Sequence, residues 1–354
     1  MKILKHVLKF RPYFLPAAAA LVVILIISIW YIIFNGFPSF TKDISFNFFS
    51  HKVEYTNPLD GEVVESREGT EVQVVGIMID NHPDAWPQSG VSAAKIVYEV
   101  LVEGGLTRYF AIYDSKQVVP EVGPVRSART YFLDWIQEYG NGLYVHSGGS
   151  PAALAAIKPR KVFDANEFFW GEYFWRATDH FAPHNLYISS ENWQKMLEVR
   201  GNTTSIFASD KAWKYSQSVG VTLASSSQLK INFNLYYKVA WNYDKDKLQY
   251  LRSINRDVEK DKDGSEIWAR NIVVQFTDVA DITNDDKGRQ EIKTTGSGDA
   301  IILKKGSVVY GTWKKNNIKD RTRFYDSNNQ EVLFVPGNTW IEVLPKGLDV
   351  EITD

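Results

Sequence analysis

Residues 72–80 read VQVVGIMID, a β-branched apolar run that ends in a polar residue. Such a run is typical of a buried strand. Two further runs, IVYEVLVE at 96–103 and LTRYFAIYD at 106–114, alternate apolar and polar residues on either side of a diglycine. Because glycine adopts the positive φ that a tight turn needs, these two runs predict a β-hairpin.

Helices alternate with these predicted strands. Residues 127–139 (SARTYFLDWIQEY) have helical apolar spacing, and we expect their first serine to be the N-cap. Residues 143–149 (LYVHSGG) read as a short strand running into a glycine loop, after which Ser150-Pro151 begins a helix, and another helix is expected from Ser190. Since a hairpin lies among these elements, the predicted fold class is α+β, with helices packed on a mixed sheet.

The amino-acid composition excludes several kinds of site and partner for this protein. The chain has 354 residues, a net charge of −2 and no cysteine. Missing cysteine excludes thiol nucleophiles, thiolate metal sites, disulfides and a lipid-modified cysteine. Residues 1–34 hold four cations and no acid, so the remaining 320 residues carry −6. We therefore expect no nucleic-acid partner, because nucleic-acid-binding surfaces are basic.

An apolar run near the N-terminus predicts a membrane anchor. Residues 17–34 (AAAALVVILIISIWYIIF) contain only one polar residue and, at a rise of ~1.5 Å per residue, span roughly 27 Å, the thickness of a bilayer core. The cations before the run predict a cytoplasmic N-terminus, with the rest of the chain outside. We expect an uncleaved, single-pass signal anchor in the cell membrane. A cleaved signal peptide is the alternative, but its apolar region is usually shorter.

The predicted domain organisation follows from changes in composition. Residues 216–227 are rich in serine and other small or polar residues, and beyond them short strands are separated by Asp, Asn, Lys and Gly turns. The predicted parts are a cytoplasmic tail (1–16), the transmembrane anchor (17–34), a tether (35–60), an α+β domain (61–215), a linker (216–229) and a β-rich C-terminal domain (230–354).

Six motifs follow one another in the first domain: GIMIDNHP, WPQSG, YEVLVEGGLTR, GPVRSAR, YVHSGGSP and APHNLY. The second domain contains GTWKK, TRFYD and PGNTWIEV. Together they resemble the YerB-like family of extracytoplasmic bacterial proteins, which are often described as lipoproteins and have no established activity. The resemblance covers approximately residues 60–350 and implies an α+β first domain followed by a separate β-rich domain. This chain departs from lipoprotein members because it has no cysteine to acylate, which leaves the predicted helix as anchor.

Carboxylate and imidazole side chains in these motifs are candidates for general acid–base catalysis, because their environment can place their pKa values on either side of neutral. These catalytic candidates are Asp80, Glu103, His146 and His184. The alternative is structural: Glu99 and Glu103 pair with Arg108 across the hairpin, and His146 is hydrogen-bonded at the end of its strand.

Arginines and amides in the same motifs are candidates for binding an anion. Guanidinium groups pair with phosphate or carboxylate, and a helix that begins next to Arg126 and Arg129 adds exposed N–H groups. The ligand-binding candidates are Asn81, Arg108, Arg126, Arg129, Ser147 and Asn185. Alternatively, each arginine pairs with a carboxylate or a buried carbonyl and fixes the fold.

No metal or cofactor is predicted. Asp80, His82, His146 and His184 are eligible ligands, but they show no His-x-x-x-His or Asp-x-Asp spacing. No catalytic motif is complete, and the serines of the SGGSP loop are expected to cap a helix. The aromatic stretch at 168–175 (FFWGEYFW) is expected in the core, with a sugar-stacking platform or membrane contact as alternatives.

These observations favour a membrane-anchored cell-envelope protein that binds an anionic envelope polymer or a protein partner. The alternatives are a hydrolase or transferase of wall polymer that uses a carboxylate–histidine pair, and a structural partner in a membrane complex. We expect the candidate residues to gather in one region of the first domain, because they end predicted strands and begin predicted loops.

Overall fold

The computed structural model describes residues 11–35, 54–140, 142–201, 206–207, 209–218 and 227–353. The chain divides into two units, Met1–Val53 and Glu54–Asp354. Parts of the predicted tail (1–10), tether (36–53) and linker (219–226) lie outside the described residues.

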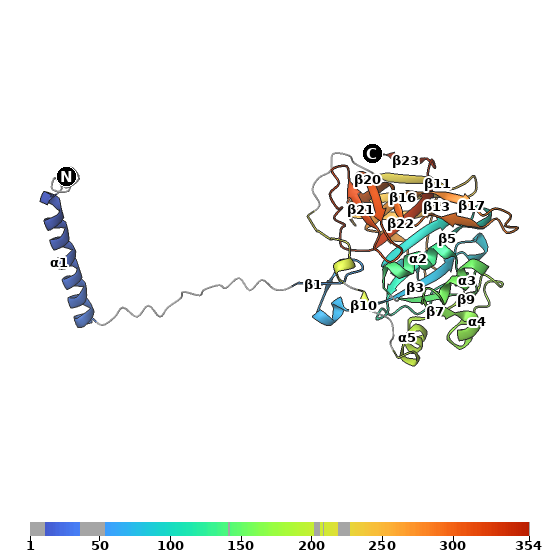
Figure 1. Ribbon diagram of the computed structural model, residues 1–354, viewed down its shortest axis with the longest axis horizontal. Helices are drawn as coiled ribbons and strands as arrows, with labels where there is room; N and C mark the ends of the chain where they lie inside the picture. Colours follow the sequence, from blue (N-terminus) through green and yellow to red (C-terminus); the bar gives the residue numbers. More distant parts are fainter. Residues whose placement is uncertain are drawn as a thin grey trace, which may run out of the picture. The chain divides into compact units, whose positions relative to one another are not determined.

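The first unit contains the helix α1 (Arg11–Asn35), whose side chains are described from residue 19 to residue 34 (Figure 1). Almost all of these side chains are exposed. Within the part of the chain that the structure describes, no helix has both the length and the apolar character needed to cross a membrane.

The second unit is built around an eleven-stranded mixed sheet, called the large sheet below. In spatial order its strands are β21 (Arg323–Asp326), β20 (Ser307–Lys315), β19 (Gly296–Lys304), β16 (Asn271–Thr277), β22 (Thr339–Pro345), β4 (Ile96–Leu101), β5 (Thr107–Asp114), β3 (Val72–Asp80), β6 (Leu143–His146) and β7 (Phe163–Asn166), with β10 (Ile206–Phe207) paired to β3. Strand β22 runs parallel to both of its neighbours, β16 and β4. Strands from both sides of the predicted linker therefore belong to one sheet.

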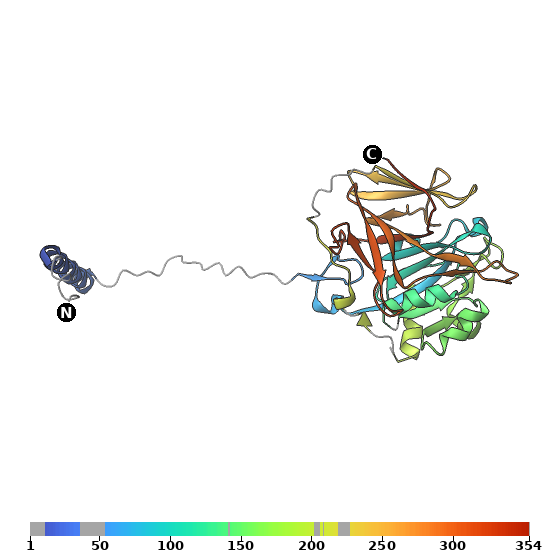
Figure 2. The same cartoon turned by 45° about the horizontal axis from the view of Figure 1, so that its top comes forward.

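A six-stranded sheet, called the small sheet, covers one face of the large sheet (Figure 2). It consists of β14 (Asp257–Val258), β13 (Gln249–Ile254), β12 (Lys238–Asp244), β11 (Gln228–Asn232) and β23 (Val350–Thr353), with β15 (Trp268–Ala269) paired to β13. Apolar side chains such as Ile77 of the large sheet and Trp241 of the small sheet share one core. Helix α5 (Ser190–Val199) packs into this core through Trp193.

Helices α2 (Thr130–Glu138) and α3 (Pro151–Ile157) cover the opposite face of the large sheet (Figure 2). The remaining elements are short: β1 (Tyr55–Thr56), β2 (Val63–Val64), β8 (Trp175–Arg176), β9 (Leu186–Tyr187), β17 (Val279–Asp281), β18 (Gln290–Ile292), α4 (Glu167–Trp170), and the 3-10 helices η1 (Arg67–Thr70), η2 (Pro83–Ala85), η3 (Val91–Ala93), η4 (Glu103–Gly105), η5 (Gly171–Tyr173) and η6 (Ser209–Lys211). The body is thus layered, with α2 and α3, the large sheet and the small sheet in that order, while α5 packs into the core shared by the two sheets.

Most predicted elements are present. The run at 72–80 forms β3, and the two runs after it form the hairpin β4–β5, with Gly104 and Gly105 at φ values of 70° and 71°. Ser150 caps α3 by accepting a hydrogen bond from the N–H of Ala153. The mixed α+β class and the mostly β character of the C-terminal region are confirmed.

The predicted start of the second helix is wrong: α2 begins at Thr130, and its N-cap, Arg129, lies two residues after the expected N-cap, Ser127. The backbone just before α2 is already hydrogen-bonded elsewhere. Ala128 donates to the carbonyl of Gly148 and accepts from Ser150, and Ser147 donates to the carbonyl of Arg126. Because these groups are committed to the loop after β6, the helix cannot begin earlier.

Candidate functional site

Three neighbouring parallel strands, β3, β6 and β7, end at the same edge of the large sheet. At this edge the Oδ2 atom of Asp80 lies 2.8 Å from the Nε atom of Arg126 and 2.7 Å from the Nδ1 atom of His184. A carboxylate oxygen only accepts, so the geometry assigns the proton of His184 to Nδ1 and leaves the Nε2 lone pair free. The structure thus brings together three candidates that are far apart in the sequence.

A second group of candidates surrounds Glu103. Its carboxylate lies 2.5 Å from the Nε atom of Arg129, 3.9 Å from Arg108 and 4.0 Å from Arg289. Burial alone raises the pKa of Glu103, but the hydrogen bond and charge of Arg129 outweigh burial and lower it. Burial, and then the charge of Arg129, lower the pKa of Arg108.

The three candidate arginines are largely engaged by the protein itself. Arg126 pairs with Asp80, Arg129 donates to Glu103 and to the carbonyl of Ala128, and Arg108 donates to the carbonyl of Ser127. These are the contacts expected if the arginines fix the loops at this edge. The helix start expected beside them is present but shifted, because α2 begins at Thr130 and Arg129 occupies the N-cap position without a capping bond from its side chain.

The remaining candidates on this side of the sheet are also partnered. The buried ring of His146 has its Nδ1 atom 2.7 Å from the carbonyl of Gly148 and its Nε2 atom 2.5 Å from Asp164. Ser147 donates to Glu167, and Asn185 accepts from Arg176. Both nitrogens of His146 are therefore occupied, which leaves it without a free nitrogen for a substrate.

Asn81 lies on the other face of the sheet from Asp80, because consecutive residues of an extended chain point to opposite sides. Its amide nitrogen donates to Thr107 and to the hydroxyl of Tyr237, both at 2.6 Å. Its carbonyl oxygen accepts from Trp86 and Gln88. Buried and fully hydrogen-bonded, Asn81 joins the two sheets rather than facing the same edge as Asp80.

A buried ionic network continues from Asn81 between the two sheets. Arg252 of β13 is fully buried and pairs with Glu99 of β4 and with Glu259. Glu342 of β22 is also fully buried, and its pKa is raised well above its usual value by burial and by the charge of Glu99. The sequence interpretation missed Arg252. The strand pattern could have identified it, because Arg252 lies two residues after buried Tyr250 and therefore faces the same side of the strand.

The aromatic stretch at 168–175 divides between core and surface. Trp170, Tyr173 and Phe174 pack against the core, as expected. Phe168 and Phe169 are 70% and 78% exposed, so the core prediction is wrong for these two residues. Both lie on the single turn α4, which is too short to bury more than one of its sides.

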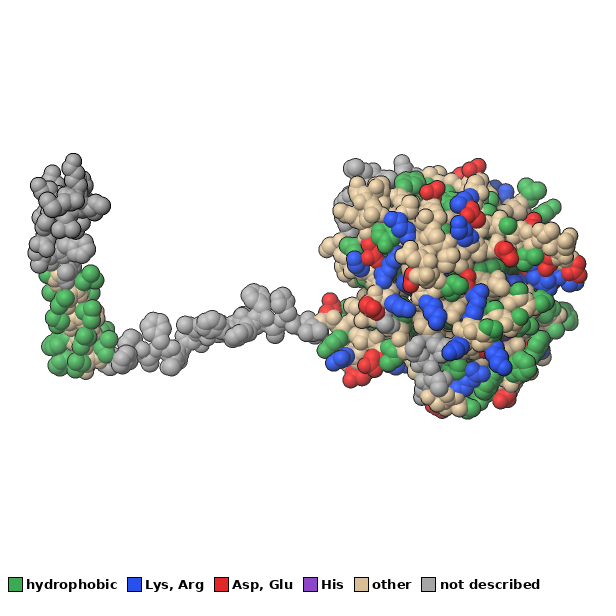
Figure 3. Space-filling view, in the orientation of Figure 1, with side chains coloured by type: hydrophobic (Ala, Val, Ile, Leu, Met, Phe, Trp, Pro, Cys, Tyr) green, Lys and Arg blue, Asp and Glu red, His purple; other side chains and the backbone are tan. Residues whose placement is uncertain are grey.

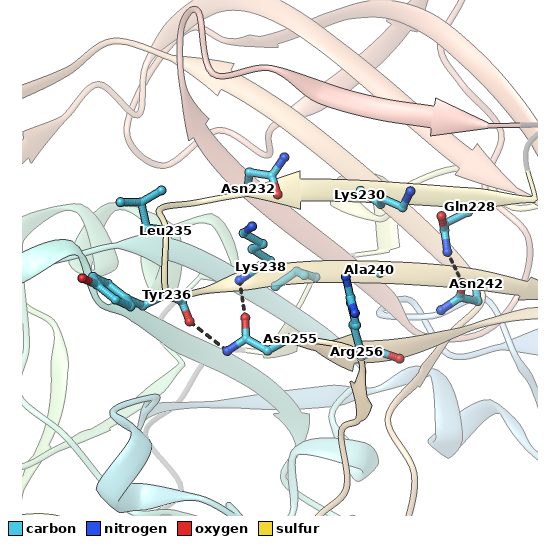
Figure 4. Close-up of a pocket in the computed structure, with 12 residues that line it drawn as sticks. Gln228, Lys230, Asn232, Leu235, Tyr236, Lys238, Ala240, Asn242, Asn255 and Arg256 are labelled. Atoms are coloured by element: carbon cyan, nitrogen blue, oxygen red, sulfur yellow. Dashed lines mark hydrogen bonds between the residues drawn. The ribbon is translucent and has the colours of Figure 1, made fainter.

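A groove that the sequence interpretation did not identify crosses the outer face of the small sheet (Figure 4). Its volume is about 760 Å³. It is lined by Gln228, Lys230, Asn232, Leu235, Tyr236, Lys238, Val239, Ala240, Asn242, Ser253, Asn255 and Arg256. None of these lining residues is acidic. The groove is therefore a cationic and amide-rich surface.

The charges in the groove are only partly compensated. Lys230 lies 3.5 Å from Glu351, whereas Lys238 and Arg256 form no ion pair with any described residue. Figure 4 shows Leu235 and Tyr236 at the turn that follows β11. Their side chains are 83% and 85% exposed, so they form an apolar and aromatic lip at one end of the groove.

Two models of one established family match most of this chain, which therefore belongs to that family. The family is described as "Protein of unknown function (DUF3048)"; its N-terminal domain matches residues 59–203 and its C-terminal domain matches residues 229–341. The resemblance to the YerB-like family is thereby confirmed.

Individual relatives agree with this assignment. The chain is 32% identical over 301 residues to "Putative lipoprotein YerB" of Bacillus subtilis (strain 168), an alignment that covers 81% of this chain and 86% of that protein. The crystal structure of the YerB protein from Bacillus subtilis superimposes with a TM-score of 0.76 at 30% identity, over 85% of this chain and 100% of that one.

Proposed function

We propose that this protein is anchored in the cell membrane and binds an anionic polymer of the cell envelope in the groove of the small sheet. The observation that carries the proposal is the lining of the groove, which combines three cations with four side-chain amides and has no carboxylate. Guanidinium and ammonium groups bind phosphate or carboxylate, while amides exchange hydrogen bonds with hydroxyl groups. A phosphate- or carboxylate-bearing glycan or polyol supplies both kinds of group.

Two features favour a polymer over a small anion. The groove is open along the sheet surface, and its cations come from two strands and a turn, so they can contact successive charges of a chain. The exposed ring of Tyr236 at one end offers an apolar face on which a sugar ring can stack. A protein partner with an acidic surface is the other ligand that this charge pattern fits.

An enzymatic role has weaker support. Asp80 and His184 form the carboxylate–histidine pair that a wall hydrolase would use. However, Arg126 shares the same carboxylate oxygen, and the ring of His184 stacks on His82 at a centroid distance of 4.6 Å. Among the described residues, no serine or threonine hydroxyl is hydrogen-bonded to His184.

The binding proposal is tested by calorimetric titration of the full chain, in detergent micelles, with poly(glycerol phosphate) and with a neutral glycan. We expect the phosphate polymer to bind and the neutral glycan not to bind. The double variant Lys238→Gln/Arg256→Gln should bind at least about tenfold more weakly, because one hydrogen bond to a charged group contributes about 1.5–3 kcal/mol.

The matched control removes two exposed cations near the end of α3, Lys158→Gln/Lys161→Gln. It changes the net charge equally but leaves the groove intact, so its affinity should equal that of the wild type. Equal weakening in both double variants would show that net charge, not the groove, determines binding. Binding that is unaffected by the groove substitutions would remove the groove from the function.

The anchor part of the proposal assigns residues 17–34 to the bilayer. Apolar side chains cover the described part of α1 (Figure 3). The name of the Bacillus relative includes the word lipoprotein, but this chain has no cysteine to carry a lipid. A helix that spans the membrane gives the same tethering without acylation.

The topology is tested with a reporter fused to the C-terminus and with N-terminal sequencing of the mature protein. We expect reporter activity outside the cytoplasm and a mature chain that retains residues 17–34, because the cations before this segment keep the N-terminus inside. Reporter activity in the cytoplasm would show that the orientation is opposite to the one proposed, and a mature N-terminus beyond residue 34 would exclude the anchor.

A further inference from the structure

We propose that His82, Asp84 and His184 form a zinc-binding site. One ring nitrogen from each histidine and one carboxylate oxygen of Asp84 lie within 4.8 Å of one another. His82 and Asp84 belong to the loop after β3, and His184 belongs to the loop between β8 and β9. Two imidazoles and one carboxylate are a donor set that zinc takes, with a fourth position left for water.

Asp80 orients the two histidines of this donor set through hydrogen bonds. Its Oδ2 atom holds the Nδ1 proton of His184, so that the free Nε2 lone pair can serve as a metal donor. Its Oδ1 atom accepts a hydrogen bond of 3.1 Å from the backbone N–H of His82. A carboxylate that fixes the tautomer of a ligand histidine is the usual outer shell of a zinc site. Arg126 in turn fixes the carboxylate.

The side chains must rearrange and move closer together to coordinate a metal. Tetrahedral ligands at about 2.1 Å from zinc lie about 3.4 Å apart, somewhat closer than the separations in this cluster. Asp84 is 74% and His82 is 33% exposed, so both can rotate, whereas His184 is held at 13% exposure. His82 leaves its stacked position on His184 and its contact with the backbone of Asp84 when it coordinates.

Zinc would join two loops that are far apart in the sequence. The loop after β3 and the loop between β8 and β9 already contact each other, since the Nε2 atom of His180 lies 3.1 Å from the carbonyl of Trp86. A bound metal would add coordinate bonds to this contact and replace the stacking of His82 on His184. The site uses none of the groove residues, so it stands independently of the proposed polymer binding.

The experiment is a calorimetric titration of the full chain, in detergent micelles, with ZnCl₂ alone and with MgCl₂ as the comparison ion. We expect one saturable zinc site per chain and no saturable binding of magnesium, because magnesium prefers oxygen ligands. The variants Asp84→Asn and His184→Gln should each bind zinc at least about tenfold more weakly. The control Glu191→Gln removes an equally exposed carboxylate outside the cluster and should bind zinc as the wild type does.

Thermal unfolding separates loss of a ligand from loss of the fold. Zinc should raise the unfolding temperature of the wild type and of Glu191→Gln, but not that of His184→Gln, since a ligand that binds only the folded state stabilises it. Asp84 is exposed, so Asp84→Asn should keep the unfolding temperature of the metal-free wild type. Absence of saturable zinc binding, or an unchanged affinity in Asp84→Asn, overturns the proposal.

Discussion

Arg252 illustrates how much of this fold depends on single buried charges. It lies between Glu99 and Glu259, and it donates hydrogen bonds to the hydroxyls of Tyr109 and Tyr237. Removal of one partner from such a pair leaves an uncompensated charge and costs about 3–5 kcal/mol. The network therefore fixes how the two sheets meet.

Glu342 belongs to the same network but lacks a cation of its own. One of its oxygens accepts from the indole N–H of Trp241, and the other has no hydrogen-bond partner among the described residues. Burial and the neighbouring Glu99 raise its pKa above the usual 4.5. Near this value and somewhat above it, Glu342 keeps its proton in the folded state.

This protonation gives a pH-dependent stability. Below pH 4.5 Glu342 is protonated in both states; as the pH rises toward its folded-state pKa, only the unfolded chain releases the proton, and stability falls. Glu342→Gln cannot titrate. In urea denaturation at a series of pH values, its free energy of unfolding should therefore decrease less steeply above pH 4.5 than that of the wild type. The difference between the two slopes should be up to about 1.4 kcal/mol per pH unit. The control is Glu351→Gln, an exposed substitution. Parallel curves for the wild type and Glu342→Gln would refute this role.

At the scale of single residues, the sequence identifies polar candidates but not the surfaces they face. Asp80 and Asn81 are adjacent, yet one meets the loops at the sheet edge and the other meets the small sheet. Both faces of β3 are buried, so no apolar–polar alternation marks either face as functional. The contact between Asp80 and His184 depends on tertiary structure for the same reason.

At the scale of elements, sequence patterns predict a turn or a helix correctly where residues next to one another in the chain determine its structure. The hairpin turn needs glycine, and α3 has its own cap, so both are found from sequence. The start of α2 depends on hydrogen bonds from Ala128 to the loop after β6, about twenty residues away. No local pattern contains that information, and the predicted start was wrong.

The groove shows the same limit for a candidate site. Its cations, Lys230, Lys238 and Arg256, come from separate segments of the small sheet and its turns. In the sequence, each of these cations is typical of a solvent-exposed position in a strand or turn. Only the pairing of β11 with β12 and of β12 with β13 places them on one face. Alternation could have shown that these side chains face outward, but not that they face the same groove.

At the scale of the whole molecule, the two family domains are structurally joined. Strands from both lie in the large sheet, and a second buried network links them: Glu138 of α2 pairs with Lys315 of β20 and with Arg321. Residues 54–354 form one unit. This unity distinguishes the structure from two separately folded domains on a linker.

We therefore expect residues 54–354 to unfold in a single cooperative transition within the full chain. Far-ultraviolet circular dichroism, which follows secondary structure, and tryptophan fluorescence, which follows packing, should give coincident denaturation curves. Joined domains unfold together because loss of either one exposes the core of the other. Two separated transitions would show that the domains are energetically independent despite the shared sheet.

The position of β22 in the sheet also has a consequence for folding during synthesis on the ribosome. A ribosome finishes β4 at Leu101, but β22, its neighbour in the large sheet, begins only at Thr339. Throughout the intervening synthesis β4 keeps one edge without its native partner, as does β16 once it is complete at Thr277, and open strand edges recruit other chains into aggregates. The large sheet therefore closes late, and the edge of β4 stays open for most of the synthesis of the chain.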